Sequence, residues 1–593
     1  MADTGSSQLI PLQAVERQIR LKTRGKGRQA DPEALREVGR WLGTAPRRRD
    51  LLIEHLHRIQ DATGQLSDRH LVALASEMKI APAEVYEVAT FYHHFDVVRG
   101  ADAATTASTT VRVCDSVSCE MAGARDLLER LPGLLGLGAR VVAAPCVGRC
   151  EQAPAVIVGQ NPLPNATCDS VKAAVAAQAT FHPRADDREA FDPLEFIEPA
   201  STPGPGCTVA PAYAGYATYR NTGGYGLLAD CLAGKQDAEA LIAKMEQSGL
   251  RGLGGAGFPA GRKWRIVRAE AGPKVMAVNI DEGEPGTFKD RTYLERDPHR
   301  FLEGMLIAAW VAGVGSVYIY LRDEYHGCRA LLEREIAELK ADPPCALPPI
   351  ELRRGAGAYI CGEESAMIES IEGRRGQPRL RPPYVAQVGL FGYPTLEHNF
   401  ETVYWVRDIL TRGPDWFAGF GRHGRRGLRS FSVSGRVRRP GVHLAPAGIT
   451  VRELIDEYCG GMQAGHTFYA YLPGGASGGI LPARLGDVPL DFDTLQAHGC
   501  FIGSAAVVIL SDSDRARDAA RNIMAFFKHE SCGQCTPCRV GTAKAAILMQ
   551  APKWDLDTLE DLSQVMGDAS ICGLGQAAPN PIRCVAKYFS HEV

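Results

Sequence analysis

The sequence predicts a multidomain α/β protein that has helical segments at both ends. Its 593 residues are too many for one core, because domains average roughly 100 to 200 residues. Strand-like and helical segments alternate over residues 109–180 and 225–425, the pattern of sheets covered by helices. Residues 30–100 and 513–593 show helical apolar spacing instead. We therefore expect several separate cores.

The first predicted unit is a small helical bundle at residues 30–105. LLIEHLHRIQ has helical spacing, Ser67 can cap a second helix, and Pro82 stands where a third can begin. LASEMKIAPAEVYEVATFY resembles a helix-turn-helix, but its second helix has two glutamates and no Lys or Arg to meet phosphates. We expect this bundle to serve packing. Residues 1–29 are predicted to be a flexible basic arm rather than an organelle transit peptide.

A compact α/β module is predicted at residues 106–180. TTVRVC, ARVVAAPC and AVIVG are strand-like, and AGARDLLERL and SVKAAVAAQ are helical. Residues 181–222 are rich in Pro, Gly, Ala and Asp, which indicates a linker or an extended wrap over a neighbour. Residues 223–427 return to alternating helices and strands. This pattern predicts a parallel-sheet domain that holds a cofactor.

The longest apolar run, residues 304–321, is long enough to suggest a membrane span. Gly313 and Gly315 interrupt it, and its last residues are β-branched and aromatic. A buried helix that leads into a buried strand is therefore the preferred interpretation.

Two smaller units are predicted after this domain. Residues 428–512 contain the short strands SFSVSG, TFYAYLPGG and AAVVILS and one helix, VRELIDEYCG, which indicates a small mixed module. Residues 513–593 contain four helical segments, DRARDAARNIMAFFKHE, RVGTAKAAILMQ, TLEDLSQVMG and PIRCVAKYF. A terminal helical bundle is expected there.

Composition excludes several classes of function. The formal net charge is -3, and 45% of residues are hydrophobic and 23% charged. This balance is ordinary for a globular protein and implies neither a nucleic-acid nor a membrane partner. No signal peptide is evident, so the 17 cysteines do not indicate a secreted disulfide scaffold, and a cytoplasmic location is expected.

Eight cysteines form two groups that could bind metal. The front group, Cys114, Cys119, Cys146 and Cys150, has its pairs at the ends of predicted strands. Its spacing fits zinc knuckles only loosely and does not fit plant ferredoxins. An iron-sulfur cluster is favoured over zinc, and unrelated cysteines remain a third interpretation.

The rear group begins with SCGQCTPC, which holds Cys532, Cys535 and Cys538. A fourth ligand could come from Cys500, Cys572 or Cys584. Cys500 and Cys584 are better explained as packing residues, whereas Cys572 lies on a loop between helices. Three closely spaced thiolates can cap one face of a cluster at the start of a helix, where free N–H groups and Arg539 ease negative charge.

Two glycine-and-carboxylate loops indicate one nucleotide pocket. The second is GAGAYICGEESAMIES, where Gly355, Gly357 and Gly362 precede Glu363 and Glu364. The first, GLRGLGGAGFPAGRKW, contains a literal GxGxxG at Gly252, Gly254 and Gly257, but a helix rather than a strand precedes it, so the dinucleotide fingerprint is not met. A structural glycine loop is the competing interpretation. Asp281, Glu282 and Glu284 crowd the end of the strand VMAVN. They could be a solvated loop, a metal site or acceptors for cofactor hydroxyls, and a metal site is the least favoured.

Six motifs in order resemble the NADH-binding flavoprotein subunit of respiratory complex I: GLRGLGGAGFPAGRKW, NIDEGEPGTFKDR, GAGAYICGEESAMIESIEGRRGQPR, PPY, HNFETV and ESCGQCTPCRVGT. Residues from about 30 to 180 resemble the complex I subunit that carries a 2Fe-2S cluster on a thioredoxin-like fold. The resemblance implies a thioredoxin-like module, an FMN- and NAD-binding domain, a ubiquitin-like (SLBB-type) module at residues 428–512, and a helical bundle at 513–593 that binds a 4Fe-4S cluster with Cys572 as fourth ligand.

The resemblance also implies the binding residues. FMN would be held by Gly252, Gly254, Lys263, Asn279, Asp281, Glu282, Gly362, Asn399 and Thr402, with Gly257 and Tyr359 also lining the cofactor site. NAD would touch Phe258, Glu284, Glu363, Glu364, Arg381 and Tyr384, with Glu284 positioning the nicotinamide. Three departures stand out. Leu253 replaces an arginine, Ile266 replaces an aromatic that helps sandwich the adenine, and His398 replaces an asparagine.

The resemblance therefore implies two complex I subunits joined in one chain, and such fusions occur in diaphorase subunits. The chain looks most like the beta subunit of a molybdenum- or tungsten-dependent, NAD-linked formate dehydrogenase. The segments that carry this likeness are the front helices and the motifs GILP, CFIGSAAVVILSD and SICGLGQAA. The implied partner is an alpha subunit with a metal-pterin centre and further iron-sulfur clusters. A diaphorase of an NAD-reducing hydrogenase or a complex I module would share every site, and a zinc-stabilised binding scaffold is the remote alternative. No Ser/His/Asp or Cys/His catalytic arrangement is evident, and His93 and His94 of FYHHF are interpreted as packing or surface residues.

Overall fold

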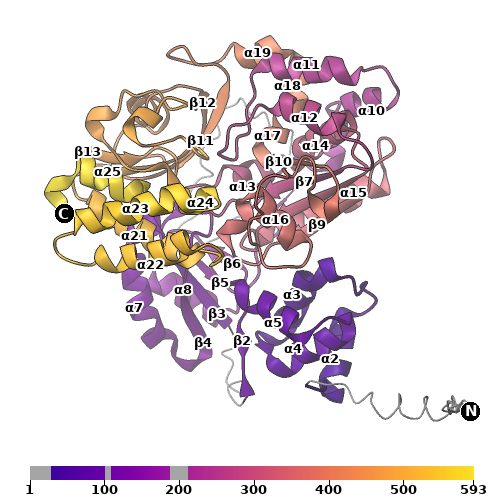
Figure 1. Ribbon diagram of the computed structural model, residues 1–593, viewed down its shortest axis with the longest axis horizontal. Helices are drawn as coiled ribbons and strands as arrows, with labels where there is room; N and C mark the ends of the chain where they lie inside the picture. The colour runs from indigo at the N-terminus through magenta and orange to yellow at the C-terminus, as the bar shows by residue number, and fades with distance from the viewer. Residues whose placement is uncertain (1–27, 101–108, 187–210) are drawn as a thin grey trace, which may run out of the picture.

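The computed structural model describes residues 28–100, 109–186 and 211–593 (Figure 1). The predicted basic arm lies outside the described residues except for its last two positions. Most of the predicted linker, residues 187–210, lies outside them as well.

The front unit is a bundle of four helices. Ser67 Oγ accepts a hydrogen bond from the His70 amide at 3.4 Å and so caps α4, while Pro82 occupies the first turn of α5, as the sequence predicts. The buried side chains of this bundle form one continuous core with residues of the later domains. The helices are α2 (Pro32–Leu42), α3 (Leu52–Thr63), α4 (Asp68–Met78) and α5 (Pro82–Phe91).

A four-stranded mixed sheet follows, in the order β4-β3-β5-β6. β3 pairs in parallel with β4 and antiparallel with β5, and helices α7 and α8 lie beside the sheet (Figure 1). The elements are β3 (Thr109–Cys114), α6 (Val117–Met121), α7 (Ala124–Leu135), β4 (Ala139–Ala144), β5 (Val156–Val158), β6 (Asn161–Leu163) and α8 (Cys168–Ala176).

The largest unit contains an all-parallel sheet in the order β10-β7-β8-β9. Every residue of β7 is buried, as expected for a central parallel strand. The strands are β7 (Val275–Ile280), β8 (Ser316–Leu321), β9 (Ile350–Arg354) and β10 (Thr395–Asn399). The helices that matter for the site are α11 (Ala238–Ser248), α12 (Ala260–Ala269), α13 (Lys289–Leu294), α14 (Pro298–Ala312), α15 (His326–Ala341), α16 (Glu364–Ile371) and α17 (Phe400–Tyr404).

The long apolar run is divided between α14 and β8, so the predicted change from buried helix to buried strand is confirmed. Gly313 ends α14 with φ of 73°, a left-handed conformation that glycine adopts without strain. Within the described residues, no helix has the length and apolar character needed to cross a bilayer.

A five-stranded mixed sheet, β12-β11-β15-β13-β14, forms the next module. The three predicted strands are present, but the predicted helix is shorter: α20 (Val451–Glu453) passes directly into a π-helical turn, Leu454–Tyr458. Two further strands were not predicted: β12 begins with glycine and ends with proline, and β14 is only two residues long. The strands are β11 (Leu428–Gly435), β12 (Gly441–Pro446), β13 (Phe468–Leu472), β14 (Leu481–Pro482) and β15 (Ala506–Ser511).

The chain ends in a helical bundle that lies beside the five-stranded sheet (Figure 1). The four predicted helices are present, and a fifth short helix, α24, begins directly after Cys572. They are α21 (Ala516–Glu530), α22 (Thr536–Leu548), α23 (Leu556–Ala569), α24 (Gly573–Ala577) and α25 (Asn580–Tyr588).

Candidate functional site

Both glycine loops meet the carboxyl ends of β7 and β10, the edge where open parallel sheets bind ligands. The Asn279 side-chain amide donates to the Gly362 carbonyl at 2.9 Å. On the other side, the Leu253 amide donates to Thr402 Oγ1 at 2.9 Å. A Cβ atom on Gly254 would lie 2.9 Å from Cβ of Asn399, so only glycine fits this approach.

The remaining glycines of the first loop are also packed tightly. The Gly252 amide donates to the Phe258 carbonyl at 2.8 Å. Gly257 has φ of 67°, and a Cβ there would lie 2.6 Å from the Phe492 ring. The loop is therefore held in one shape by the five-stranded module as well as by its own domain.

Asp281 supplies a free acceptor at this edge. Its carboxyl is buried, its Oδ2 atom has no hydrogen-bond partner, and burial raises its pKa well above the ordinary value. A buried acceptor without a partner is costly unless a ligand satisfies it. A hydroxyl or ring N–H of a flavin nucleotide fits this need, so the residues present are compatible with FMN.

Glu282 has protein partners instead. Its carboxylate accepts hydrogen bonds from the amides of Asp290 and Arg291, at 2.8 and 3.1 Å, and from the Tyr325 hydroxyl at 2.8 Å. Burial, with Asp290 nearby, raises its pKa to about 7. The Glu282 side chain thus caps the start of α13 and shapes the loop around the site.

Glu284 is held by the five-stranded module. Its Oε1 accepts from the Ser477 amide at 2.8 Å and from the Ser477 hydroxyl, and its Oε2 accepts from Ser504 Oγ at 3.4 Å. Burial raises the pKa of Glu284, although the Ser477 hydrogen bonds oppose that shift. A residue far along the chain therefore orients this carboxylate.

Several charged residues predicted to bind nucleotide already have protein partners, and three of them pair with one another. Lys263 Nζ lies 2.9 Å from the Glu397 carbonyl and 3.1 Å from its carboxylate. Glu363 caps α16 through the amides of Ser365 and Ala366. Arg381 pairs with Glu363, and at 2.8 Å with Glu364.

The two aromatic residues predicted to stack on NAD are exposed. Phe258 is 38% exposed, with the Arg262 guanidinium 5.8 Å from its ring centroid, and Tyr384 is 55% exposed. Ile266 is 38% exposed, so an aliphatic side chain is available where the resemblance led us to expect an aromatic one. Leu253 is buried, and His398 is buried and accepts from the Trp264 indole N–H at 2.8 Å.

Tyr359 connects the second glycine loop to the terminal bundle. Its amide donates to Glu530 Oε2 at 2.8 Å, and its ring packs 5.0 Å from that of Phe526. Glu530 is the last residue of α21, just before the rear cysteines. The structure thus brings the flavin loop and the rear cysteine loop together.

The four front cysteines gather at one end of their sheet, all buried and none in a disulfide. Cys146 Sγ lies 3.4 Å from Cys150 Sγ, and the Cys114 thiol contacts those of Cys119 and Cys146. These contacts lower the pKa of Cys146 well below its ordinary value. Amides of Gly148 and Ala155 donate to the sulfurs of Cys146 and Cys119, both at 3.4 Å.

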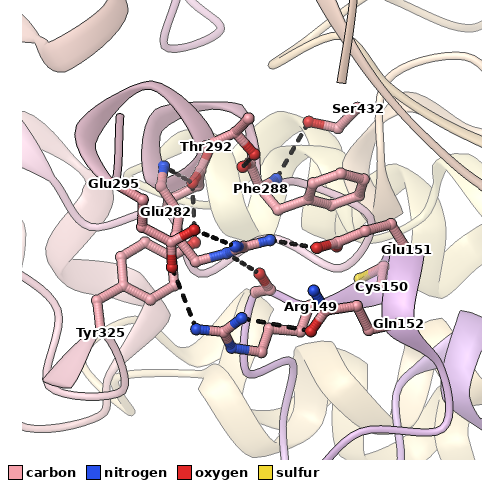
Figure 2. Close-up of polar contacts among 12 residues, drawn as sticks. Arg149, Cys150, Glu151, Gln152, Glu282, Phe288, Thr292, Glu295, Tyr325 and Ser432 are labelled. Atoms are coloured by element: carbon pink, nitrogen blue, oxygen red, sulfur yellow. Dashed lines mark hydrogen bonds and ion pairs between the residues drawn. The ribbon is translucent and has the colours of Figure 1, made fainter. Parts of the chain in front are cut away.

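Buried charges attach this group to the flavin domain (Figure 2). Arg149 pairs with Glu295 at 3.2 Å. Arg291 donates to the Gly148 carbonyl at 2.9 Å and pairs with Glu151 and, at 2.7 Å, with Glu295. Burial tends to raise the pKa of Glu295, but Arg291 and Arg149 outweigh it and lower the pKa to about 2.

The rear cysteines surround the start of α22. Cys535 is its N-cap, Cys538 lies in its first turn, and Cys532 interacts electrostatically with Cys535, Cys538 and Cys572. Amides of Leu574 and Gly575 donate to the Cys572 sulfur. Cys500 and Cys584, the rival candidates, instead form a buried pair with sulfurs 3.5 Å apart.

The spread of the sulfurs favours clusters over single ions. Four thiolates around one zinc ion, at about 2.3 Å from it, lie roughly 3.8 Å apart. Among the described residues, no three cysteine sulfurs lie within 4.8 Å of one another. Both groups therefore fit multi-iron clusters better than zinc.

The arrangement, a glycine-rich edge of a parallel sheet joined to two groups of four thiols, is that of an electron-transfer flavoprotein. Family comparisons agree with this class. Residues 245–408 match the Nuo51 FMN-binding domain, 518–593 the NADH-ubiquinone oxidoreductase-F iron-sulfur binding region, 38–179 the thioredoxin-like [2Fe-2S] ferredoxin, and 430–481 the SLBB domain. The predicted fold class and the FMN, NAD, 2Fe-2S and 4Fe-4S cofactors are thereby confirmed.

Whole-protein comparisons define the family. The chain is 42% identical over 391 residues to an NADH-quinone oxidoreductase subunit of Rhizobium meliloti, covering 63% of this chain and 93% of the relative. It is 41% identical over 372 residues to the mitochondrial NADH dehydrogenase [ubiquinone] flavoprotein 1 of Dictyostelium discoideum. This match covers 60% of this chain and 78% of the relative. The chain belongs to this family of NADH-binding FMN flavoprotein subunits.

A solved structure matches the fused arrangement. One chain of an NAD+-reducing [NiFe]-hydrogenase in the H2-reduced state aligns with a TM-score of 0.76 and 30% identity, covering 92% of both chains. That match includes both the front module and the flavoprotein part.

Sequence reasoning missed several residues that shape the site. Ser477 and Ser504 orient Glu284, and Arg291 joins the front module to the flavin domain. Ser477 lies in GGASGG, whose glycines indicate a turn but not its partner. Arg291 lies within the quoted motif NIDEGEPGTFKDR, and only the fold shows that it reaches Gly148.

Proposed function

We propose that this chain is the NAD-reducing diaphorase subunit of a molybdenum- or tungsten-dependent formate dehydrogenase complex in the cytoplasm. The observation that carries the proposal is the fused architecture with four gathered thiols at the front and four at the rear. The sequence segments that resemble formate dehydrogenase beta subunits support formate as the electron source. The partner would be an alpha subunit with a metal-pterin centre and further iron-sulfur clusters.

The proposed cofactor contacts are those that the resemblance implies, and the geometry of the described residues is compatible with them. FMN would lie between the loop of Gly252 and Gly254 and the strand end at Asn279 and Asp281, with Lys263, Gly362, Asn399 and Thr402 around it. NAD would stack on Phe258 and Tyr384, with Glu284, Glu363, Glu364 and Arg381 as polar partners. The front and rear thiols would hold the 2Fe-2S and 4Fe-4S clusters, respectively. We also propose the domain limits predicted from the sequence.

When bound, FMN exchanges hydride with the nicotinamide and single electrons with iron-sulfur clusters. The chain's own residues provide position and exclude water. Ser477 fixes the Glu284 carboxylate so that it can accept a hydrogen bond from the nicotinamide carboxamide. Asp281 Oδ2 offers an acceptor to the flavin, and Asn279 locks the neighbouring loop through Gly362. This explains why no acid-base residue of the chain is needed.

The native complex tests the proposal. We expect a metal-pterin subunit to co-purify with this chain and formate, but not hydrogen, to reduce NAD in that complex. Co-purification of a [NiFe] subunit together with hydrogen-dependent NAD reduction would favour the second candidate, a hydrogenase diaphorase, which the match over 92% of both chains supports. Assembly with quinone-reducing membrane subunits would favour a complex I module.

Optical spectra test the cofactors independently of the partner. The purified chain is expected to be coloured, to release FMN on denaturation and to contain labile sulfide. A colourless protein loaded with zinc would contradict both the formate and the hydrogenase proposals.

A further inference from the structure

The two adjacent histidines of FYHHF belong to different side-chain clusters. His94 Nδ1 lies 2.7 Å from Asp323, but Arg354 and Arg329 also pair with that carboxylate, at 2.5 and 3.4 Å. Two guanidinium groups make this buried cluster a poor place for a cation. His93, at the end of α5, instead meets His529 and Glu530 at the end of α21.

The His93 cluster has ligand-like geometry. The two imidazole centroids are 3.8 Å apart, with ring planes inclined by 44°. Glu530 Oε1 lies 3.0 Å from His529 Nδ1 and 4.0 Å from His93 Nδ1. One nitrogen or oxygen atom from each residue lies within 4.8 Å of those of the other two. Ligands at about 2.1 Å around a tetrahedral ion are roughly 3.4 Å apart, between the two measured separations.

The electrostatic surroundings favour a cation. The Glu530 carboxylate is 2% exposed, and within the described residues its ion-pair partners are these two histidines rather than any Lys or Arg. Glu324 and Asp115 interact with the imidazoles of His93 and His529, respectively. Negative charge therefore surrounds two imidazoles that crowd each other.

Access and orientation also suit a metal site. His93 and His529 are 39% and 46% exposed, so an ion can enter from solvent and keep a water ligand. Glu530 Oε2 is held by the Tyr359 amide at 2.8 Å, which fixes the carboxylate from behind. Two imidazoles, one carboxylate and an open fourth position are a ligand set that zinc accepts.

We propose that His93, His529 and Glu530 bind one divalent transition-metal ion of the zinc class, separate from the two cysteine clusters. The ion cross-links the front bundle to the segment that precedes Cys532. Imidazole and carboxylate ligands also suit nickel and cobalt. The affinities of this site for the different ions therefore follow the general order of first-row divalent metals, and the protein adds no preference of its own.

Zinc content of the complete protein tests the site. The protein is equilibrated with zinc chloride and then passed through gel filtration. The wild-type protein is expected to retain one zinc ion more than the His93→Asn or His529→Asn variant. The affinity of each variant for zinc at this site should fall more than about tenfold. The matched control is His423→Asn, because His423 is 44% exposed and pairs with one carboxylate, Glu453, at 3.1 Å. Iron and flavin contents equal to wild type show that each variant is folded.

X-ray absorption at the zinc edge distinguishes this site from zinc at the cysteines. We expect only nitrogen and oxygen ligands, at about 2.0 to 2.2 Å, with an imidazole signature. Equal zinc contents in wild type and in the His93→Asn/His529→Asn double variant would overturn the proposal. Sulfur ligation at about 2.3 Å would do so as well.

Discussion

The two cysteine clusters differ in how they face the solvent. All four front cysteines are buried, at most 4% exposed, whereas Cys532 and Cys535 of the rear group are only partly buried. Apolar side chains of α22 are also exposed: Val540, two residues after Cys538, at 37%, and Ile547, at the other end of the helix, at 69%. The rear group is therefore the accessible one, and under the proposed function electrons from the partner subunit would enter there.

The attachments of the two groups also differ. The front group is tied to the flavin domain by buried ion pairs around Arg291. The rear group is tied by a shared apolar core and by hydrogen bonds such as Tyr359 to Glu530. Charge fixes one side of the flavin site, and packing with neutral donors fixes the other. Variants can test this contrast.

The largest effect is expected from Cys572→Ala. The rear group then has three thiols, so the 4Fe-4S electron paramagnetic resonance signal and electron delivery from the partner should be lost while FMN stays bound. Flavin content, iron content and the spectrum measure this. Cys584→Ala is the control, because that cysteine pairs with Cys500 and should leave the signal intact. An unchanged 4Fe-4S signal in Cys572→Ala would exclude it as the fourth ligand.

Arg291→Met should destabilise the front attachment by about 3 to 5 kcal/mol, because Glu151 and Glu295 lose a partner in a buried site. Thermal unfolding and limited proteolysis of the front module measure this. Arg130→Met is the control. Arg130 pairs with Asp126 at 3.0 Å on an exposed helix face, where solvent screens the pair, so this substitution should leave stability close to that of wild type. Equal effects of the two substitutions would contradict the contrast.

The front attachment should weaken in acid. The pKa of Glu295 is lowered to about 2 in the folded protein, so its contribution is fully present above the unfolded value near 4.5 and is lost as pH falls toward 2. Wild type and Glu295→Gln differ in their free energy of unfolding. That difference should become smaller by about 1 kcal/mol when the pH is lowered from 6 to 3.5. A difference that stays constant over this range would show that Glu295 is not held by Arg291 and Arg149.

Ser477→Ala should act on the nicotinamide side. Loss of the Ser477 hydroxyl removes one donor from the buried Glu284 carboxylate, at a cost of about 1 to 3 kcal/mol. We expect roughly a tenfold loss of kcat/KM for NADH with an artificial acceptor, while iron and flavin contents are retained. The Ser513→Ala variant, changed outside this network, should behave as wild type. An unchanged kcat/KM in Ser477→Ala would remove Ser477 from the positioning network.

The smallest effect on the isolated chain is expected from Ile547→Gln. This exposed side chain should alter stability by less than about 0.5 kcal/mol. If the partner subunit docks on the exposed side of α22, this substitution should nevertheless weaken reassembly of the complex. Leu137→Gln, at a fully exposed leucine of the front module, is the matched control. Equal reassembly of both variants would argue against docking at α22.

Much of the fold could be predicted from local patterns. The change from α14 to β8 follows from two glycines and a β-branched tail, and α5 begins at Pro82 as expected. The thiol groups were predictable because cysteine spacing is visible in the sequence. The cross-domain partners were not, since Ser477 reaches Glu284 over 193 positions and Arg291 reaches Gly148 over 143. Local periodicity carries no information on such pairings.

Under the proposed function, the hydrogen bond from Tyr359 to Glu530 would also complete a through-bond route for electrons. From Cys532 the covalent chain passes through Ser531 to Glu530, whose carboxylate is joined to the backbone of the flavin loop at 2.8 Å. One hydrogen bond thus completes an otherwise covalent path between the two loops. Electronic coupling along this route would depend on the geometry of that hydrogen bond rather than on a through-space gap.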